Sequence, residues 1–443
     1  MAFAIDPTEQ SIEPIPTAKR GLGAWDTFVL WADLGISFLV MVVGMFLVPG
    51  LGLAQALLAI LVGALIGNAL LGLAATVGAD TGVPTMVLLR GPLGLRGSYA
   101  PTVLNILQLL GWATFEVIVM AQAANVLATQ FLGLPPAYHV WVAFFTLLTL
   151  LLALSGPVRV TKQVLEKFVI WAVLASTLWI TVALLGRHDV GALLAAPGTG
   201  ELSFWAAVDL VVALPISWFP LVADYSRFAR SRAAAFFGTA GGYFVPQVWF
   251  YALGALLVLA GSAQPNPDEP ILPLLGAIAG LGLGWAALLV LLVDETDEGF
   301  ANIYSTAVSL QNLFPRASQR ALIVAISAVV LVAASVVPLV QYESFLLLIG
   351  SFFVPLLGLL VADYFWVKRG YRVAELFGPK GAYWYTAGVN WPAIGVWAIG
   401  VATYLAISGL PALGVAGLAP WLGASLPSFA VALLLWAALG RRA

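Results

Sequence analysis

Residues 294–302 read DETDEGFAN and place four carboxylates within five positions of a predicted membrane-spanning helix. They follow the apolar run 285–293 without an intervening Pro, which favours one continuous helix over a hydrophilic loop between two short apolar segments. An ionised side chain at the bilayer centre costs roughly 3 kcal/mol, so it persists there when it faces a polar cavity, an ion or another polar group. Asp294, Glu298 and Asn302 share one helical face. We predict that this face lines a path for a substrate and an ion.

The composition is that of a membrane protein. The 443 residues are 62% hydrophobic and only 9% charged, whereas soluble domains are about half apolar. Apolar runs of about 20 residues recur and indicate an all-α polytopic membrane protein surrounded by lipid. A net charge of −2 offers no basic surface for nucleic acid, and the lack of Cys excludes disulfides and thiolate chemistry. No resident cofactor is expected, and the sequence does not determine the oligomeric state, although a monomer is compatible with these features.

Twelve spans and a polar N-terminal segment, 1–22, are expected. The loop 79–99 follows the second span, and 271–280 is predicted as a short surface helix. With the N-terminus inside, 18 of the 19 Lys and Arg fall on the inner side and only Arg187 falls outside. Because inner loops are enriched in Lys and Arg, we expect cytoplasmic termini and the inner (plasma) membrane. The spans are approximately 26–49, 53–78, 100–130, 138–155, 166–186, 204–223, 235–262, 282–312, 321–340, 344–363, 385–408 and 422–440.

Two spans carry interruptions. The first contains Asp33 and Gly35 near its middle, and the sixth contains Pro215 and Pro220. A helical Pro removes a backbone donor, and the freed backbone groups need partners that an ion or a substrate can supply. Ordinary kinks are the alternative at either place. Because the interruptions are five spans apart, we predict inverted repeats at 23–186 and 204–363, followed by two further helices in 385–443.

The third span carries one polar and aromatic stripe. Asn105, Gln108, Trp112 and Glu116 recur at spacings of three and four residues, so they share one helical face. Packing or interface anchoring is the alternative role of a membrane Trp. A Trp between Gln and Glu is better interpreted as a stacking platform beside hydrogen-bonding groups.

The sequence resembles the nucleobase:cation symporter-1 family, whose permeases carry cytosine, purines, hydantoins, allantoin and related rings. The resemblance covers nearly the whole chain and implies a leucine-transporter-type fold, with broken helices 1 and 6, two extra C-terminal helices and alternating access driven by Na⁺ or H⁺. The motifs that carry it are TGVP at 81–84, RGPLGLRGS at 90–98, GW at 111–112, ADYSRF at 223–228 and FANIYS at 300–305.

The resemblance also implies a substrate site. Trp112 matches the family's stacking Trp, and Glu116 stands where relatives use Gln. Asn302 matches a substrate-binding Asn, and Glu298 stands where a second Asn can occur. In helix six Pro215 occupies a position where an aromatic residue is expected. Together with Gln108 from the stripe, the expected substrate-binding residues are Gln108, Trp112, Glu116, Ser217, Trp218, Phe219, Glu298 and Asn302.

A cation site is implied in the same way. Thr296 and Asp297 match the family's two oxygen ligands for Na⁺ on helix eight, and the Val293 carbonyl is the third. Backbone carbonyls near the first interruption complete the set, and we expect them at Asp33, Gly35 and Ile36. Buried acids are equally suited to a proton relay, so Na⁺ and H⁺ remain two alternatives.

The run DETDE at 294–298, together with FANIYS at 300–305, resembles the branch of the family that is assigned to hydroxymethylpyrimidine, a thiamine precursor. A carboxylate can accept from the exocyclic amine of an aminopyrimidine, and Trp112 can stack on its ring. We therefore predict a symporter for a pyrimidine-type ring. A cytosine, other nucleobase or allantoin permease of the same fold is the first alternative. An intramembrane acid/base enzyme is the alternative from another class of protein. Against it, the acids crowd on one helix instead of facing each other across two helices.

Overall fold

A computed structural model describes residues 11–156, 170–261, 263, 266, 271–337, 342–379, 381–410 and 414–441. Parts of the predicted tails and spans, namely 1–10, 166–169, 262, 338–340 and 442–443, lie outside the described residues. The α-helices are α1 (Ala24–Asp33), α2 (Phe38–Phe46), α3 (Leu53–Thr81), α4 (Thr85–Leu88), α5 (Arg90–Leu93), α6 (Tyr99–Val126), α7 (Tyr138–Ser155), α9 (Ile170–Leu185), α10 (Val190–Ala195), α11 (Phe204–Ser217), α12 (Val222–Ser226), α13 (Arg232–Leu259), α14 (Leu272–Ala279), α15 (Gly284–Leu313), α16 (Gln319–Val336), α17 (Tyr342–Ala362), α18 (Trp391–Ser408) and α19 (Ser425–Leu439). Short 3₁₀ or π segments are η2 (Thr17–Lys19), η3 (Leu127–Phe131), η5 (Phe219–Leu221), η6 (Asp363–Val367), η7 (Val373–Leu376) and η9 (Pro420–Leu422), and β1 (Gly409–Leu410) pairs antiparallel with β2 (Val415–Ala416).

The helices agree with the predicted spans. Among the described helices, eight are long and apolar enough to cross a membrane, and the bent pair α1–α2 makes nine. The other three predicted spans correspond to α9 and α19, which are shorter apolar helices, and to α15, which carries the acidic run. The predicted span 385–408 is too long, because its helix begins only at Trp391. Tyr385 and Ala387 have positive φ, and this turn precedes α18.

Both predicted interruptions change the backbone. Helix α1 ends at Asp33, α2 starts at Phe38, and the two axes differ by 65°. The Ser37 hydroxyl caps α2 by accepting from the Leu39 N–H at 3.0 Å. The second interruption is milder. Pro215 stays inside α11, and the 3₁₀ turn η5 around Pro220 connects α11 to α12 within one span.

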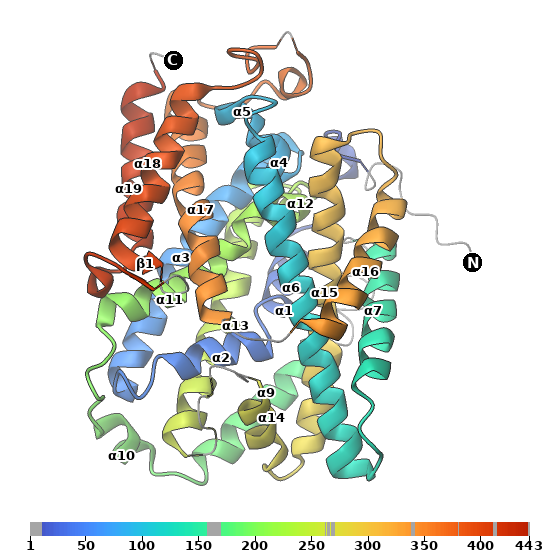
Figure 1. Cartoon of the computed structure of the whole chain (residues 1–443), viewed down its shortest axis with the longest axis vertical. Helices are drawn as coiled ribbons and strands as arrows, with labels where there is room; N and C mark the ends of the chain where they lie inside the picture. The colour runs from blue at the N-terminus through green and yellow to red at the C-terminus, as the bar shows by residue number, and fades with distance from the viewer. Residues whose placement is uncertain are drawn as a thin grey trace.

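The helices nearest the interruptions pack as two groups (Figure 1). In the first group, α1, α2 and α3 pack against α13, and α3 also packs against α11. In the second group, α15 packs against α6, α7 and α16. Helices α17, α18 and α19 pack on one another beside the first group. Segments far apart in the sequence thereby meet, and the polar faces of α6 and α15 are brought together.

Basic side chains gather at the end of the bundle where α3, α12 and α15 terminate. Arg90 Nε donates to Asn312 Oδ1 at 2.8 Å, and Arg232 pairs with Asp80 at 2.7 Å. Burial lowers the pKa of Arg90 to about 10, so this side chain stays charged at neutral pH. The grouping agrees with the loop assignment made from charge, in which Arg90, Arg227 and Arg232 lie on the same side of the membrane.

Helices α2 and α13 cross in direct backbone contact at Gly254, where an added Cβ would overlap the Met41 carbonyl. We expect Gly254→Ala to lower the unfolding temperature of the purified protein, because forcing a methyl into a packed interface costs about 1–3 kcal/mol. Gly395→Ala is the matched control, since nothing lies within 4 Å of a Cβ at that helical position. Equal unfolding temperatures for the two variants would contradict the close crossing.

Candidate functional site

A cavity lies at the junction of α2, α6, α11, α13 and α15. It contains about 340 Å³ of space not filled by protein atoms, and only a small part of that space is wide enough for water. The cavity is therefore narrow, and a ring-sized molecule needs its walls to move apart. The lining residues are Ser37, Leu39, Val40, Trp112, Glu116, Leu214, Ser217, Trp218, Leu221, Tyr243, Glu298 and Asn302.

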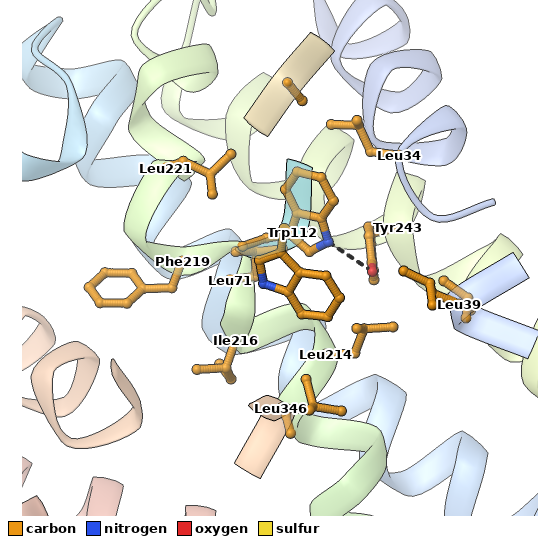
Figure 2. Packing of buried hydrophobic residues seen from close by; sticks show 14 of the residues in the cluster. Leu34, Leu39, Leu71, Trp112, Leu214, Ile216, Phe219, Leu221, Tyr243 and Leu346 are labelled. Carbon is orange, nitrogen blue, oxygen red and sulfur yellow. Dashed lines mark hydrogen bonds between the residues drawn. The ribbon is translucent and has the colours of Figure 1, made fainter. Parts of the chain in front are cut away.

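Aromatic side chains form part of its wall. Trp112 packs edge-on against Phe345, with ring centres 5.3 Å apart. Trp218 Nε1 donates to the Tyr243 hydroxyl at 3.0 Å, the bond drawn as a dashed line in Figure 2. Trp218 also meets Trp31 of α1 edge-on at 5.9 Å. Phe345 of α17 therefore supports Trp112, whereas Trp31 of α1 and Tyr243 of α13 support Trp218, so contacts within the protein hold the aromatic wall in place.

Three glutamates meet beside the cavity. Glu116 of α6 and Glu295 and Glu298 of α15 are all buried, and one oxygen from each lies within 4.8 Å of the others. Glu295 accepts from the Ser37 hydroxyl at 2.8 Å and from the Phe38 N–H at 3.2 Å. Because Phe38 is the first residue of α2, Glu295 binds the positive end of that helix and connects α15 to the first interruption.

Three aspartates form a second acidic group. Asp33, the last residue of α1, lies close enough to Asp294 and Asp297 of α15 for their carboxyls to interact. All six oxygens are buried and have no hydrogen-bond donor among the described residues. The group also lies at the negative end of α1, which favours a cation. Such oxygens need protons or a bound cation, so the donor set suits Na⁺ or H⁺.

The structure places the predicted substrate residues in two classes. Trp112, Glu116, Ser217, Trp218, Glu298 and Asn302 line the cavity. Gln108 and Phe219 do not, so direct contact with a substrate is not supported for them. Gln108 Nε2 donates to Asn105 at 2.8 Å and to the Ser217 carbonyl at 3.3 Å. The Phe219 ring is fully buried and points away from Trp112 in Figure 2.

The predicted cation-binding residues also differ in the partners that the structure gives them. Asp33 and Asp297 meet, as described above, and Gly35 and Ile36 lie in the bend between α1 and α2. Thr296 Oγ1 donates to the Val293 carbonyl at 2.7 Å, and both oxygens keep a lone pair, so their role as cation ligands stays a prediction. Asp294, which was not among the predicted cation ligands, also lies beside Asp33.

Glu295 and Tyr243 are among the residues of the site that sequence reasoning missed. Glu295 was counted among the buried acids but received no role, because its partners Ser37 and Phe38 belong to a different helix. Tyr243 lies on α13, in a stretch whose pattern is that of an ordinary apolar helix, so no sequence signal pointed to it. Asp209 accepts from the N–H groups of Ala424 and Ser425 and so caps α19.

Comparisons with known proteins agree on one family. A family model described as a permease for cytosine/purines, uracil, thiamine and allantoin matches residues 14–423. The hydantoin permease of Microbacterium maritypicum is 27% identical over 417 residues, which cover 88% of this chain and 82% of that protein. The cytosine permease of Escherichia coli is 28% identical over 407 residues, which cover 88% and 87%.

A solved structure supports the fold. A nucleobase-cation-symport-1 family transporter, in a closed conformation with bromovinylhydantoin bound, matches with a TM-score of 0.83 and 22% identity. The match covers 99% of this chain and 95% of that one. It confirms the predicted fold class, an all-α membrane bundle of the leucine-transporter type, and at this identity it concerns the fold alone.

Proposed function

The chain belongs to the family of permeases for cytosine/purines, uracil, thiamine and allantoin, the nucleobase:cation symporter-1 transporters, and on that premise we propose that it imports a flat, nitrogen-containing ring together with a cation by alternating access. Because members of this family are permeases, the intramembrane enzyme is set aside. The observation that carries the proposal is the convergence of Trp112, Glu116, Glu298 and Asn302 on one buried cavity beside the first helix interruption.

Within this class we propose a pyrimidine-type ring, with hydroxymethylpyrimidine as the first candidate. Glu116 and Glu298 offer carboxylate acceptors for an exocyclic amine, and Asn302 offers both a donor and an acceptor. Trp112 supplies a flat surface that accepts any aromatic ring. The E. coli relative is a cytosine permease, so cytosine or another nucleobase is the second candidate.

Uptake of labelled hydroxymethylpyrimidine by cells that express the chain tests the substrate. We expect saturable uptake that unlabelled hydroxymethylpyrimidine blocks more strongly than cytosine, uracil or allantoin. Cells carrying the empty vector are the control. Strong cytosine transport without hydroxymethylpyrimidine uptake would overturn the first candidate and favour the second.

We propose that the coupling cation binds the group formed by Asp33, Asp294 and Asp297, whose oxygens lack donors among the described residues. Asp297→Asn is expected to reduce accumulation of the ring against its gradient at least about 10-fold, which corresponds to about 1.4 kcal/mol of lost cation binding. Exchange of labelled for unlabelled ring needs no net cation movement, so it should be affected less.

Uptake should be measured in Na⁺ and in choline at two pH values. Loss of uptake in choline identifies Na⁺, whereas uptake that follows the proton gradient identifies H⁺. Glu201→Gln, in an exposed segment before α11, is the matched control for removing one carboxylate. Undiminished accumulation by Asp297→Asn would place the coupling site elsewhere.

A further inference from the structure

The cavity is lined by carboxylates without a basic counterpart. Glu116 and Glu298 belong to the lining, and Glu295 lies within 4.8 Å of both. None of the three forms an ion pair with a Lys or Arg in the part of the chain that the structure describes. Three acids at one buried place strongly favour a ligand that brings positive charge, because an uncompensated charge in a low-dielectric interior costs several kcal/mol.

Glu295 already has its partners. The Ser37 hydroxyl and the Phe38 N–H both donate to it at the N-terminus of α2. In transporters with broken helices such an N-terminus can receive an anionic group of the substrate. Here the protein's own carboxylate fills that position, so an anionic substrate group is excluded from it.

Glu116 and Glu298 are therefore left to face the ligand. Glu116 is only 1% exposed, and its Oε2 has no hydrogen-bond donor among the described residues. Trp112, Trp218 and Tyr243 line the same cavity, and aromatic faces attract cations as well as flat rings. Glu116, whose Oε2 lacks a donor, lies within an aromatic wall and so matches a cationic ring in both charge and shape.

We infer that the cavity binds its ring as a cation. The ring has an amidinium-type edge, in which two N–H donors share one positive charge, and this edge lies against Glu116 and Glu298. The inference rests on the proposed function and specifies the charge of the transported ring. A carboxylate accepts such an edge through two parallel charge-assisted bonds. A neutral ring of the same shape lacks the charge and binds more weakly.

Benzamidine and benzamide test this inference as competitors against a labelled ring that the uptake assay has identified. Benzamidine is a flat ring with an amidinium that is charged at neutral pH, and benzamide is its neutral counterpart of nearly the same shape. For the wild-type chain we expect benzamidine to inhibit at a concentration at least about 10-fold lower than benzamide, a difference of about 1.4 kcal/mol. Glu116→Gln and Glu298→Gln should each bring the ratio of the two inhibitory concentrations, benzamide to benzamidine, toward one.

Glu375→Gln is the matched control, because Glu375 pairs with Arg372 outside the cavity and should keep the wild-type ratio. The substitutions at Glu116 and Glu298 are close in size to the native side chains, and an unfolding temperature equal to that of the wild type reports that each purified variant is folded. A wild-type ratio near one, or a ratio unchanged in both Gln variants, overturns the inference while uptake of the ring leaves the proposed function standing. Absence of saturable uptake of any ring overturns both.

Discussion

Replacing Trp112 by Ala is expected to weaken ring binding by about 10- to 100-fold. Stacking of a base on an aromatic side chain contributes about 1–3 kcal/mol by alanine substitution, and Trp112 lies in the cavity wall next to Glu116. The Phe345 ring, 5.3 Å away, packs edge-on against Trp112 and keeps it in position. Competition binding with the purified protein measures the change directly.

The variant must be separated from a folding defect, because truncating a buried Trp to Ala also costs about 3–5 kcal/mol of stability. Trp112→Phe retains an aromatic face and should lose less than about 10-fold in affinity. Trp171→Ala, on α9 and 58% exposed, is the control for removing an indole away from the cavity. Unchanged affinity in folded Trp112→Ala protein would show that the ring binds elsewhere.

Replacing Glu295 by Ala is expected to have the second large effect, the loss of transport by at least about 30-fold. The Ser37 hydroxyl and the Phe38 N–H would each lose a buried acceptor, at about 1–3 kcal/mol apiece. The contact that joins α15 to the first interruption would also disappear. Uptake rate and unfolding temperature, measured on the same preparation, record both consequences.

Two further variants make this prediction specific. Glu295→Gln keeps one acceptor oxygen, so its transport rate should lie between those of Glu295→Ala and the wild type. Ser37→Ala removes one donor but leaves the bond from the Phe38 N–H, so it should lose the least transport of the three variants. If Glu295→Ala transports as well as Ser37→Ala, then Glu295 does not hold the interruption in place.

Part of the site follows from local properties of the chain. The stripe that contains Trp112 and Glu116 follows from helical spacing alone. The interruption near Gly35 follows from a polar residue and a Gly within an apolar run. For the same reason Glu298 and Asn302 could be assigned to one face of α15. Their positions along each helix were predictable because periodicity and the cost of buried charge act within a single segment.

Other parts required the packing of several helices. Gln108 shares the stripe with Trp112, yet in the structure it binds Asn105 and a carbonyl of α11. Thr296 and Asp297 are neighbours in the sequence, yet Thr296 bonds within α15 while Asp297 meets Asp33. Neighbouring residues on a helix point about 100° apart, so the element that each one meets decides its role.

The sequence by itself determined that this is a polytopic membrane protein with acids in the middle of α15, because hydrophobic length and helical periodicity are written into each segment. Only the tertiary structure decided how those acids are divided: Glu295 and Glu298 join Glu116, and Asp294 and Asp297 join Asp33. That division depends on where the two ends of the interrupted first helix lie against α6 and α15. A bend of 65° between α1 and α2 presents one helix end to each acidic group, and such long-range geometry cannot be obtained from the spacing of residues along one segment.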